Sequence, residues 1–399
     1  MISAPTTFNF GEDWLTASTA LSIASGKTKV ALTDSTRKKV NSSWKIVQNI
    51  VDKGDPVYGI NTGFGVGLKP LELGPKEGLA LINGTQFIAA HAVKVVEKLH
   101  ACLSHADIIG AMMIEGLQGS VKPFFKELHE LRPFKGNIHV AQRVKRLLKG
   151  SEIMEDHIDC ERVQDPYSLR CIPQVHGASR NAWLHLKELL EVELNSVTDN
   201  PVIINEEFTI SGGNFHGQPL AMALDYACLA ASEIGNISDR RIYLSLEGNS
   251  PGVPKLLMKD TGINSGYMIL QYTTAALASE NKGLCFPSSA DSIPTSLGQE
   301  DHVTAQAFEF RKPMKSGVFL DEIHKEVRKN VPFAEKDRVF ANDIEAGIQM
   351  IQDKTIIKVI HEIEKKEKIS LATQFSDEFE REKNKDERQE TRDKRQETN

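Results

Sequence analysis

The sequence predicts a mainly α-helical protein, a bundle of long helices. Two observations support this fold class. Strand-like runs are few, and only PVIINEEFTIS (201–211) is suited to a short hairpin. Apolar residues instead recur at helical spacing over long stretches, at roughly 77–119, 137–149, 176–195, 219–246 and 266–283. Polar segments containing Gly and Pro separate these stretches and are expected to be loops: 161–175, 196–218, 248–265 and 284–302.

The first long helix is expected to begin at a cap formed by Asp34 or Ser35. Its buried face is predicted from the helical spacing of four apolar residues, Val40, Trp44, Val47 and Val51. Gly54-Asp55-Pro56 should end it. The following stretch, 57–75, is Gly-rich and aperiodic and is predicted to be a loop. Within 77–119 we expect an interruption around SHAD (104–107).

Composition limits the kind of protein. The chain has 399 residues, is 40% hydrophobic and carries a formal net charge of −6, so neither nucleic acid nor an anionic membrane is expected as a partner. Five scattered cysteines lack zinc-site spacing, which favours free thiols in a reducing compartment and no metal. No secretion signal and no apolar stretch of bilayer-spanning length are recognisable. We therefore predict a cytoplasmic globular protein.

The domain organisation is predicted in four regions. An N-terminal helical and loop region (1–75) carries YGINTGFG, and a central long-helix core (76–303) carries the remaining polar loops. A shortened C-terminal helical region (304–363) precedes a charged tail (364–399), in which RQET occurs twice. The tail has too little apolar surface to offset its ordering entropy, so we expect it to be disordered.

Five loops are rich in groups that a buried polar site would use: YGINTGFG (58–65), INGTQ (82–86), RVQDPYSLRC (162–171), SGGNFHG (211–217) and QEDHV (299–303). Each also has a structural explanation when taken singly. The glycines allow turns with positive φ, Asn83 suits a helix cap, Arg170 can pair with a buried acid, and His302 can be a satisfied buried histidine. Together, Tyr, Asn, Gln, Arg and Glu between long helices favour a polar site.

Longer blocks around these loops, among them EGLALINGTQ, RVQDPYSLRCIPQVHG, NSVTDNP and AALASENK, resemble the histidine ammonia-lyase branch of the aromatic amino acid ammonia-lyases. The resemblance covers about 10–303 and, more faintly, 336–351. It implies an all-helical fold of the fumarase/aspartase-like type and a homotetramer. The implied reaction is elimination of ammonia from L-histidine to trans-urocanate in histidine catabolism. The implied electrophile is methylidene-imidazolone, formed by cyclisation of an internal Ala-Ser-Gly.

By motif match, the resemblance assigns catalytic roles to Tyr58, Tyr167 and Glu300. Tyr58 matches the family's catalytic tyrosine. A phenol has a reference pKa near ~10, so acting as a base requires neighbouring positive charge or hydrogen-bond donors. Tyr167 would form part of the polar wall. Glu300 matches the acid that meets the imidazole and favours histidine over a plain phenyl ring, because a carboxylate can accept a hydrogen bond from a ring nitrogen.

The resemblance also assigns substrate-binding roles to Asn83, Gln164, Arg170 and Phe215. Arg170 matches the residue that grips the substrate carboxylate, a task suited to a planar guanidinium. Asn83 matches the amide that supports the electrophile, and Gln164 completes the polar wall. Phe215 would pack beside the electrophile or the substrate ring.

The chain departs from the family pattern in two places. The family's GASGDLAPL-like block lies between its NTGFG loop and its EGLALINGTQ helix, whereas here VGLKPLELGPK follows Gly65 directly. A second gap follows EDHV, where long C-terminal helices are expected. Ala24-Ser25-Gly26 lies near the N-terminus outside the required surroundings, so we interpret it as coincidental and not as the precursor of the electrophile. Ser104-His105 likewise mimics a lost family loop, and no role is carried over to His105.

These departures leave three functions open. The leading hypothesis is a histidine ammonia-lyase family protein in which the activity of the shortened chain is in question. One alternative is a catalytically inactive oligomeric remnant or scaffold, and another is a tyrosine ammonia-lyase or aminomutase, which Glu300 and VQDPYSLRC make less suitable. An absorbance assay for urocanate beside one for cinnamate-type products separates them.

Overall fold

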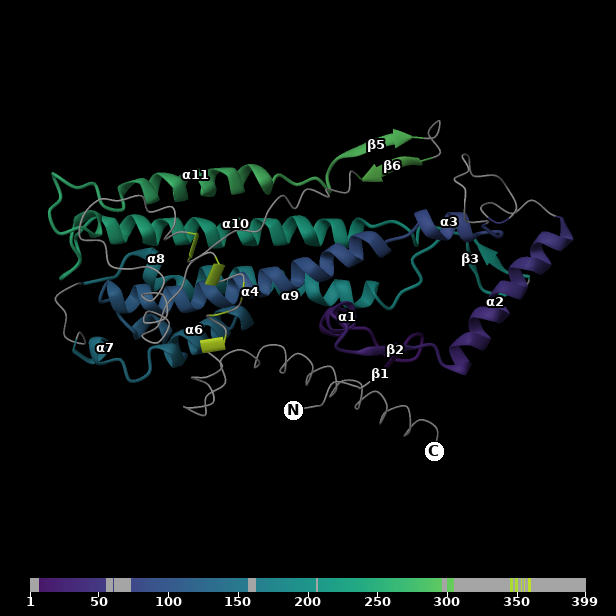
Figure 1. Ribbon diagram of the computed structural model, residues 1–399, viewed down its shortest axis with the longest axis horizontal. Helices are drawn as coiled ribbons and strands as arrows, with labels where there is room; N and C mark the ends of the chain where they lie inside the picture. Colours follow the sequence, from purple (N-terminus) through teal and green to yellow (C-terminus); the bar gives the residue numbers. More distant parts are fainter. Residues whose placement is uncertain are drawn as a thin grey trace. The chain divides into compact units, whose positions relative to one another are not determined.

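The computed structural model describes residues 7–54, 60, 73–156, 163–205, 207–295, 300–304 and single residues between 345 and 359. Tyr58, the region 364–399 and most of 304–363 lie outside the described residues. Helices predominate in the described part, with short strand pairs between them (Figure 1). The mainly α prediction is confirmed.

The long helices lie close to their predicted positions. The predicted stretches 137–149, 176–195, 219–246 and 266–283 correspond to α6, α9, α10 and α11. The helices are α1 (Ala17–Ala24), α2 (Asp34–Lys53), α3 (Glu77–Ile82), α4 (Gln86–Gly116), the 3-10 turn η1 (Lys122–Phe124), α5 (Lys126–Glu130), α6 (Lys135–Leu147), α7 (Glu152–Asp156), α8 (Tyr167–Arg170), α9 (Ile172–Glu193), α10 (Gln218–Leu246), the 3-10 turn η2 (Lys255–Leu257) and α11 (Met268–Leu284).

Among the residues that the structure describes, the strands form three separate pairs. β1 (Thr7–Asn9) is parallel to β2 (Lys29–Ala31). β3 (Val202–Ile203) is antiparallel to β4 (Thr209–Ile210), which confirms the expected hairpin within 201–211. β5 (Ser292–Thr295) pairs antiparallel with β6 (Glu300–Thr304), which begins inside the segment 284–302 that was predicted to be a loop and ends two residues after it. That prediction missed the pair because Pro294 and the neighbouring Ser and Gly residues hide the alternation of a strand.

Helix α2 has the predicted end but a different cap and face. Thr33 is the N-cap, and its hydroxyl accepts a hydrogen bond from the Thr36 N–H at 3.1 Å, so the expected cap at Asp34 or Ser35 is wrong. Gly54 ends the helix in the left-handed conformation. Val47 is buried, but Val40 and Trp44 are more than half exposed. Only part of the predicted apolar face is therefore used within this chain.

Helix α4 continues through SHAD, so the expected interruption is wrong. The break lies instead at 83–85, between α3 and α4. Asp107 is paired with buried arginines, and His105 Nδ1 lies 2.7 Å from the Ala101 carbonyl oxygen, so the helix accommodates both polar side chains without a break. Residues Glu77–Gly116 meet the length and composition of a membrane span, which was not expected, but 44% of the tested window is buried in the protein. We interpret α4 as a core helix.

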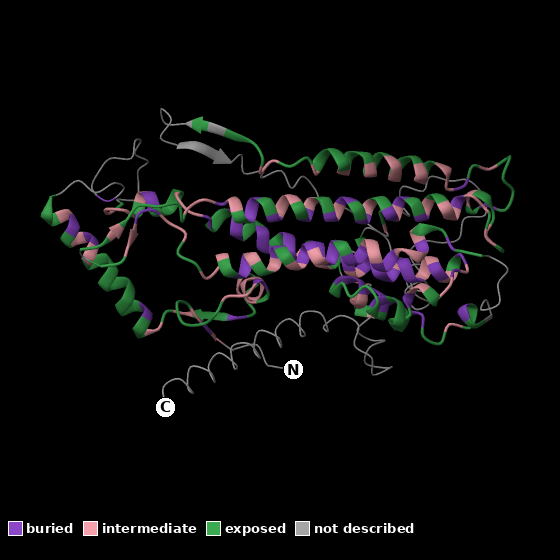
Figure 2. Ribbon diagram, turned by 180° about the vertical axis from the view of Figure 1, so that it is seen from behind, coloured by how far each residue is buried: buried purple, intermediate pink, exposed green. Residues whose placement is uncertain are grey.

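The chain forms two compact units, each made of three segments. Unit 1 comprises Met1–His100, Ala182–Leu229 and Leu284–Lys312, and unit 2 comprises Ala101–Asn181, Ala230–Gly283 and Pro313–Asn399. The main apolar core of unit 2 includes Ile108, Phe124, Val140, Leu169 and Ile172. A smaller cluster in unit 1 is formed by Val47, Ile50 and Ile60. Buried residues (purple in Figure 2) are frequent on α4 and α9, whereas no residue of α11 is buried.

Candidate active site

The four-residue helix α8 carries two of the predicted site residues, Tyr167 and Arg170. They are three positions apart and therefore share one face of the turn. The Arg170 Cζ lies 4.4 Å from the centroid of the Tyr167 ring, a cation–π geometry. Tyr167 is 70% exposed, and Arg170 is half-buried. Gln164, three residues before the start of the helix, is exposed.

The guanidinium of Arg170 is held from one side. Its Nε donates a hydrogen bond to the backbone carbonyl of Asp165 at 2.9 Å. The Asp165 carboxylate points elsewhere and accepts from the Ser120 N–H at 2.6 Å. Among the described residues Arg170 has no carboxylate partner, so the structural explanation that it pairs with a buried acid does not describe this geometry.

A second predicted site residue, Asn83, ends α3 in unit 1. Its N–H bonds the Leu79 carbonyl at 2.8 Å, and its backbone is extended. Gly84 follows with φ +111°, and a Cβ there would lie 2.1 Å from the Thr198 carbonyl oxygen. Only glycine fits this close approach of the INGTQ turn to the NSVTDNP loop. The sequence motif therefore has a definite backbone geometry, whatever Asn83 binds.

For the remaining predicted site residues the structure describes fewer contacts. Phe215 is half-buried in the loop before α10, and its ring centroid lies 6.4 Å from that of His216. Glu300 begins β6 opposite Thr295. Tyr58 lies outside the described residues. Gln164, Tyr167 and Arg170 thus lie together in unit 2, while Asn83, Phe215 and Glu300 belong to unit 1.

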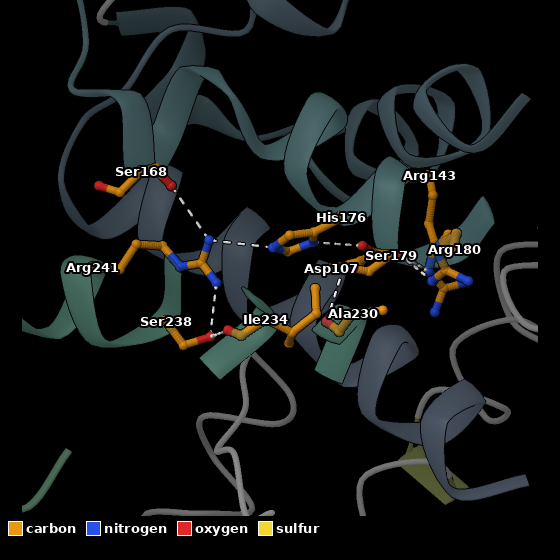
Figure 3. A network of polar contacts seen from close by, with 10 residues as sticks. All are labelled: Asp107, Arg143, Ser168, His176, Ser179, Arg180, Ala230, Ile234, Ser238 and Arg241. Atoms are coloured by element: carbon orange, nitrogen blue, oxygen red, sulfur yellow. Dashed lines mark hydrogen bonds and ion pairs between the residues drawn. The ribbon is translucent and has the colours of Figure 1, made fainter. Parts of the chain in front are cut away.

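A buried cluster of charges, not predicted from the sequence, lies next to α8 in unit 2 (Figure 3). Asp107 is fully buried and pairs with three side chains from other helices. Its Oδ2 lies 2.5 Å from Arg180 Nη2 and 3.3 Å from Arg143 Nε, and its Oδ1 lies 2.9 Å from His176 Nδ1. On the far side of the imidazole, Arg241 Nη1 lies 3.4 Å from His176 Nε2 and 3.3 Å from the Ser168 carbonyl of α8.

The electrostatics of this cluster fix its protonation states. Burial alone would raise the pKa of the Asp107 carboxyl, but the Arg180 charge and the His176 hydrogen bond hold it well below its usual range. Burial lowers the pKa of His176 despite Asp107, which makes the ring neutral. A neutral ring donates from Nδ1 to Asp107 and accepts at Nε2 from Arg241. Burial also lowers the pKa of Arg241, to about 10, so this arginine remains charged at neutral pH.

Unit 1 contains a cavity of about 540 Å³ between α1, the start of α4 and the loop after α9. Thr85, Ala89, Glu193 and Asp199 are among its lining residues. Ala24 also lines it, but no residue predicted to bind substrate does. Within the described part of the chain, no group of three or more His, Cys, Asp and Glu side chains is arranged to hold a metal ion.

The tripeptide Ala24-Ser25-Gly26 forms the end of α1. Ser25 is the C-cap, and its hydroxyl donates to the Ser22 carbonyl at 3.1 Å. The Gly26 N–H bonds the Ile23 carbonyl at 2.9 Å, and no atom lies within 4 Å of the position that a Cβ on Gly26 would occupy. This is an open, hydrogen-bonded helix end. Nothing compresses the Gly26 nitrogen onto the Ala24 carbonyl carbon, as cyclisation requires.

Comparisons with known proteins agree with the motifs. The family described as aromatic amino acid lyase matches residues 15–66 and 66–324, in two pieces that meet near the point where a family segment was expected to be missing. A histidine ammonia-lyase of Myxococcus xanthus (strain DK1622) is 41% identical over 322 residues, covering 74% of this chain. The chain spans only 63% of the length of that relative.

Solved structures share the fold. The histidine ammonia-lyase from Trypanosoma cruzi matches with a TM-score of 0.73 and 26% identity, covering 89% of this chain and 95% of that one. A tyrosine aminomutase from Streptomyces globisporus matches with a TM-score of 0.64 and 30% identity, covering 74% and 65%. The helical architecture is therefore that of the ammonia-lyases.

Proposed function

Because the chain belongs to the aromatic amino acid lyase family, we propose that it binds L-histidine at the site of the histidine ammonia-lyase reaction, in which ammonia is eliminated to give trans-urocanate. One observation carries this proposal. Arg170 is fixed through its Nε and its ring contact, and it presents its two terminal nitrogens without a carboxylate partner among the described residues. A guanidinium in this state is suited to the α-carboxylate of an amino acid.

The resemblance gives the other assigned residues roles toward the same substrate. Tyr58 is proposed to accept the β-proton, and Glu300 to hydrogen-bond an imidazole nitrogen. Asn83, Gln164 and Tyr167 would supply polar contacts, and Phe215 an apolar wall. The proposal prefers histidine over tyrosine because a carboxylate at position 300 can pair with an imidazole N–H. The tyrosine aminomutase likeness keeps tyrosine as the substrate to exclude experimentally.

The family's electrophile, methylidene-imidazolone, activates the substrate amine as a leaving group when it is present. The residues here do not fit its formation, since Ala24-Ser25-Gly26 is a relaxed helix end. We therefore propose that this chain alone recognises histidine but releases no measurable urocanate. Expelling an amine without an electrophile leaves a prohibitive barrier, however well the remaining groups are placed.

The chain is also proposed to assemble with copies of itself, as a tetramer in the cytoplasm. Helix α11 buries none of its residues, and large apolar side chains on it are exposed: Ile269, Tyr272 and Leu277. Exposed apolar side chains along one helix are typical of a surface that a partner covers. Analytical ultracentrifugation tests this, and a monodisperse monomer would contradict it.

The binding proposal is tested by calorimetry with L-histidine and L-tyrosine, beside absorbance assays for urocanate and cinnamate-type products. We expect histidine to bind, Arg170→Lys to weaken binding about 10-fold or more, and neither product to form. Arg132→Lys is the matched control, because Arg132 also lies over an aromatic ring, 5.2 Å from the Phe134 centroid, but outside every proposed site. Equal affinity in the Arg170 variant and wild type would disprove the proposal.

A further inference from the structure

The turn that carries Arg170 is held from two directions by residues to which the proposed function gives no role. Asp165 precedes the turn and is 9% exposed. Its carboxylate accepts from the Ser120 N–H at 2.6 Å, and its own carbonyl accepts from Arg170 Nε at 2.9 Å. One residue thus connects the end of the α4 region to the guanidinium that is proposed to bind substrate.

The second attachment lies inside the turn. The Ser168 carbonyl accepts from Arg241 Nη1 at 3.3 Å, and Arg241 is 1% exposed. Within the turn the Cys171 N–H bonds the Tyr167 carbonyl at 2.9 Å, and the buried cationic donor of Arg241 serves the next carbonyl, that of Ser168. Between the two attachments, the Leu169 side chain lies in the main core of unit 2.

Arg241 is itself held by the buried charge cluster. Its Nη1 contacts the neutral His176, whose other nitrogen donates to Asp107, and its Nη2 donates to the Ser238 hydroxyl at 3.1 Å. Arg241 is 1% exposed, and turning its guanidinium would take the Nη1 and Nη2 donors away from these partners in a dry environment, which restricts its orientation. Figure 3 shows the chain of contacts from Asp107 through His176 and Arg241 to Ser168.

We propose that Asp165 and Arg241 are positioning residues, which fix the α8 turn and thereby orient the Arg170 guanidinium before substrate arrives. This inference rests on the proposed role of Arg170 in binding a carboxylate. If folding already orients the long Arg170 side chain, substrate binding no longer bears the entropy cost of immobilising it. The expected gain in affinity is about 2- to 12-fold, from the usual cost of immobilising one flexible side chain.

Two substitutions at Asp165 separate its hydrogen bond from its charge. Asp165→Ala removes the acceptor for the Ser120 N–H, whereas Asp165→Asn keeps an acceptor oxygen at the same place. We expect amide hydrogen exchange across 167–171 to accelerate in Asp165→Ala and to return to the wild-type rate in Asp165→Asn. Histidine affinity should fall about 2- to 12-fold in the first variant and recover in the second.

The second attachment is tested by two substitutions at neighbouring positions of α10. Arg241→Lys removes the planar fork that spans His176, Ser168 and Ser238, while Arg240→Lys alters its neighbour, whose side chain is 61% exposed. Exchange across 167–171 should accelerate in Arg241→Lys and stay unchanged in Arg240→Lys. Unchanged exchange there in both Asp165→Ala and Arg241→Lys would overturn the proposal, as would equal acceleration throughout α9 and α10. Local acceleration in a chain that binds no histidine would support the positioning role and refute the proposed function instead.

Discussion

Two helix ends in this protein carry motifs with the residue types of an active site, and their surroundings differ completely. At α8, Arg170 is tied to the Asp165 carbonyl, and the turn beneath it contacts a buried arginine and the apolar core. At the end of α1, Ala24-Ser25-Gly26 makes only local hydrogen bonds, and the space around Gly26 is open. Residue types suggest a function in both places, but only the first has neighbours that fix a reactive group in one orientation.

The largest difference between the two regions should appear when the buried charge next to α8 is removed. Asp107→Asn leaves Arg143, Arg180 and Arg241 without a carboxylate in the cluster, and we expect unfolding free energy to fall by about 3–5 kcal/mol. Urea denaturation measures this. Glu130→Gln is the control, because its pair with Lys126 is exposed on both sides and should hardly change the midpoint. A small loss in Asp107→Asn would mean that the cluster does not support the turn.

The glycines of the two unit 1 turns allow a second comparison. Gly84→Ala forces a Cβ against the Thr198 carbonyl, so we expect a loss of about 1–3 kcal/mol from backbone strain, increased by the clash. Gly26→Ala carries a similar left-handed strain at φ +71° but meets no atom within 4 Å. In thermal unfolding, Gly84→Ala should therefore have a clearly lower melting temperature than Gly26→Ala. The reverse order would show that the INGTQ turn can move away from its neighbouring loop.

Some of these features could be predicted from the sequence and others could not. The long helices were predictable, since apolar residues recur at helical spacing over many turns. The helical turn that brings Tyr167 and Arg170 together was not, because it lies in 161–175, which was predicted to be a loop. The interruption at SHAD was predicted wrongly, because a polar Asp107 inside an apolar helix looks like a break until its partners are known. Those partners lie on other helices far along the chain, and only tertiary packing brings them together. Asp165 lies inside the block RVQDPYSLRC, but its contact with Ser120 joins residues 45 positions apart and could not be predicted from the sequence.

A pH titration tests the buried charge cluster through its His176, together with the buried His105 of α4, without any substitution in the cluster. Burial lowers the pKa of His176 and of His105 below 6.5, so the unfolded chain binds these protons more readily than the folded one. Stability is then complete above about pH 7 and is lost as the pH falls through 6.5, by at most about 1.4 kcal/mol per pH unit for each histidine. Urea midpoints between pH 8 and 5 measure this loss. His105→Gln should reduce the slope, and an unaltered slope would assign the whole loss to His176 or to other groups.

The smallest effect is expected at the α1 end. Ser25→Ala removes one exposed hydrogen bond to the Ser22 carbonyl, so stability should change by no more than about 0.5 kcal/mol. If Ser25 were the precursor of the electrophile, wild-type protein would weigh two water molecules less than its sequence requires and absorb in the near ultraviolet. The substitution would abolish both signals together with all urocanate formation.

The relaxed geometry leads us to expect the full sequence mass, no additional absorbance and no urocanate from either protein. Intact mass spectrometry decides between these outcomes without depending on activity. A two-water deficit that disappears in Ser25→Ala would mean that this helix end cyclises despite its open surroundings, and that the contrast with α8 is not the one that matters for chemistry.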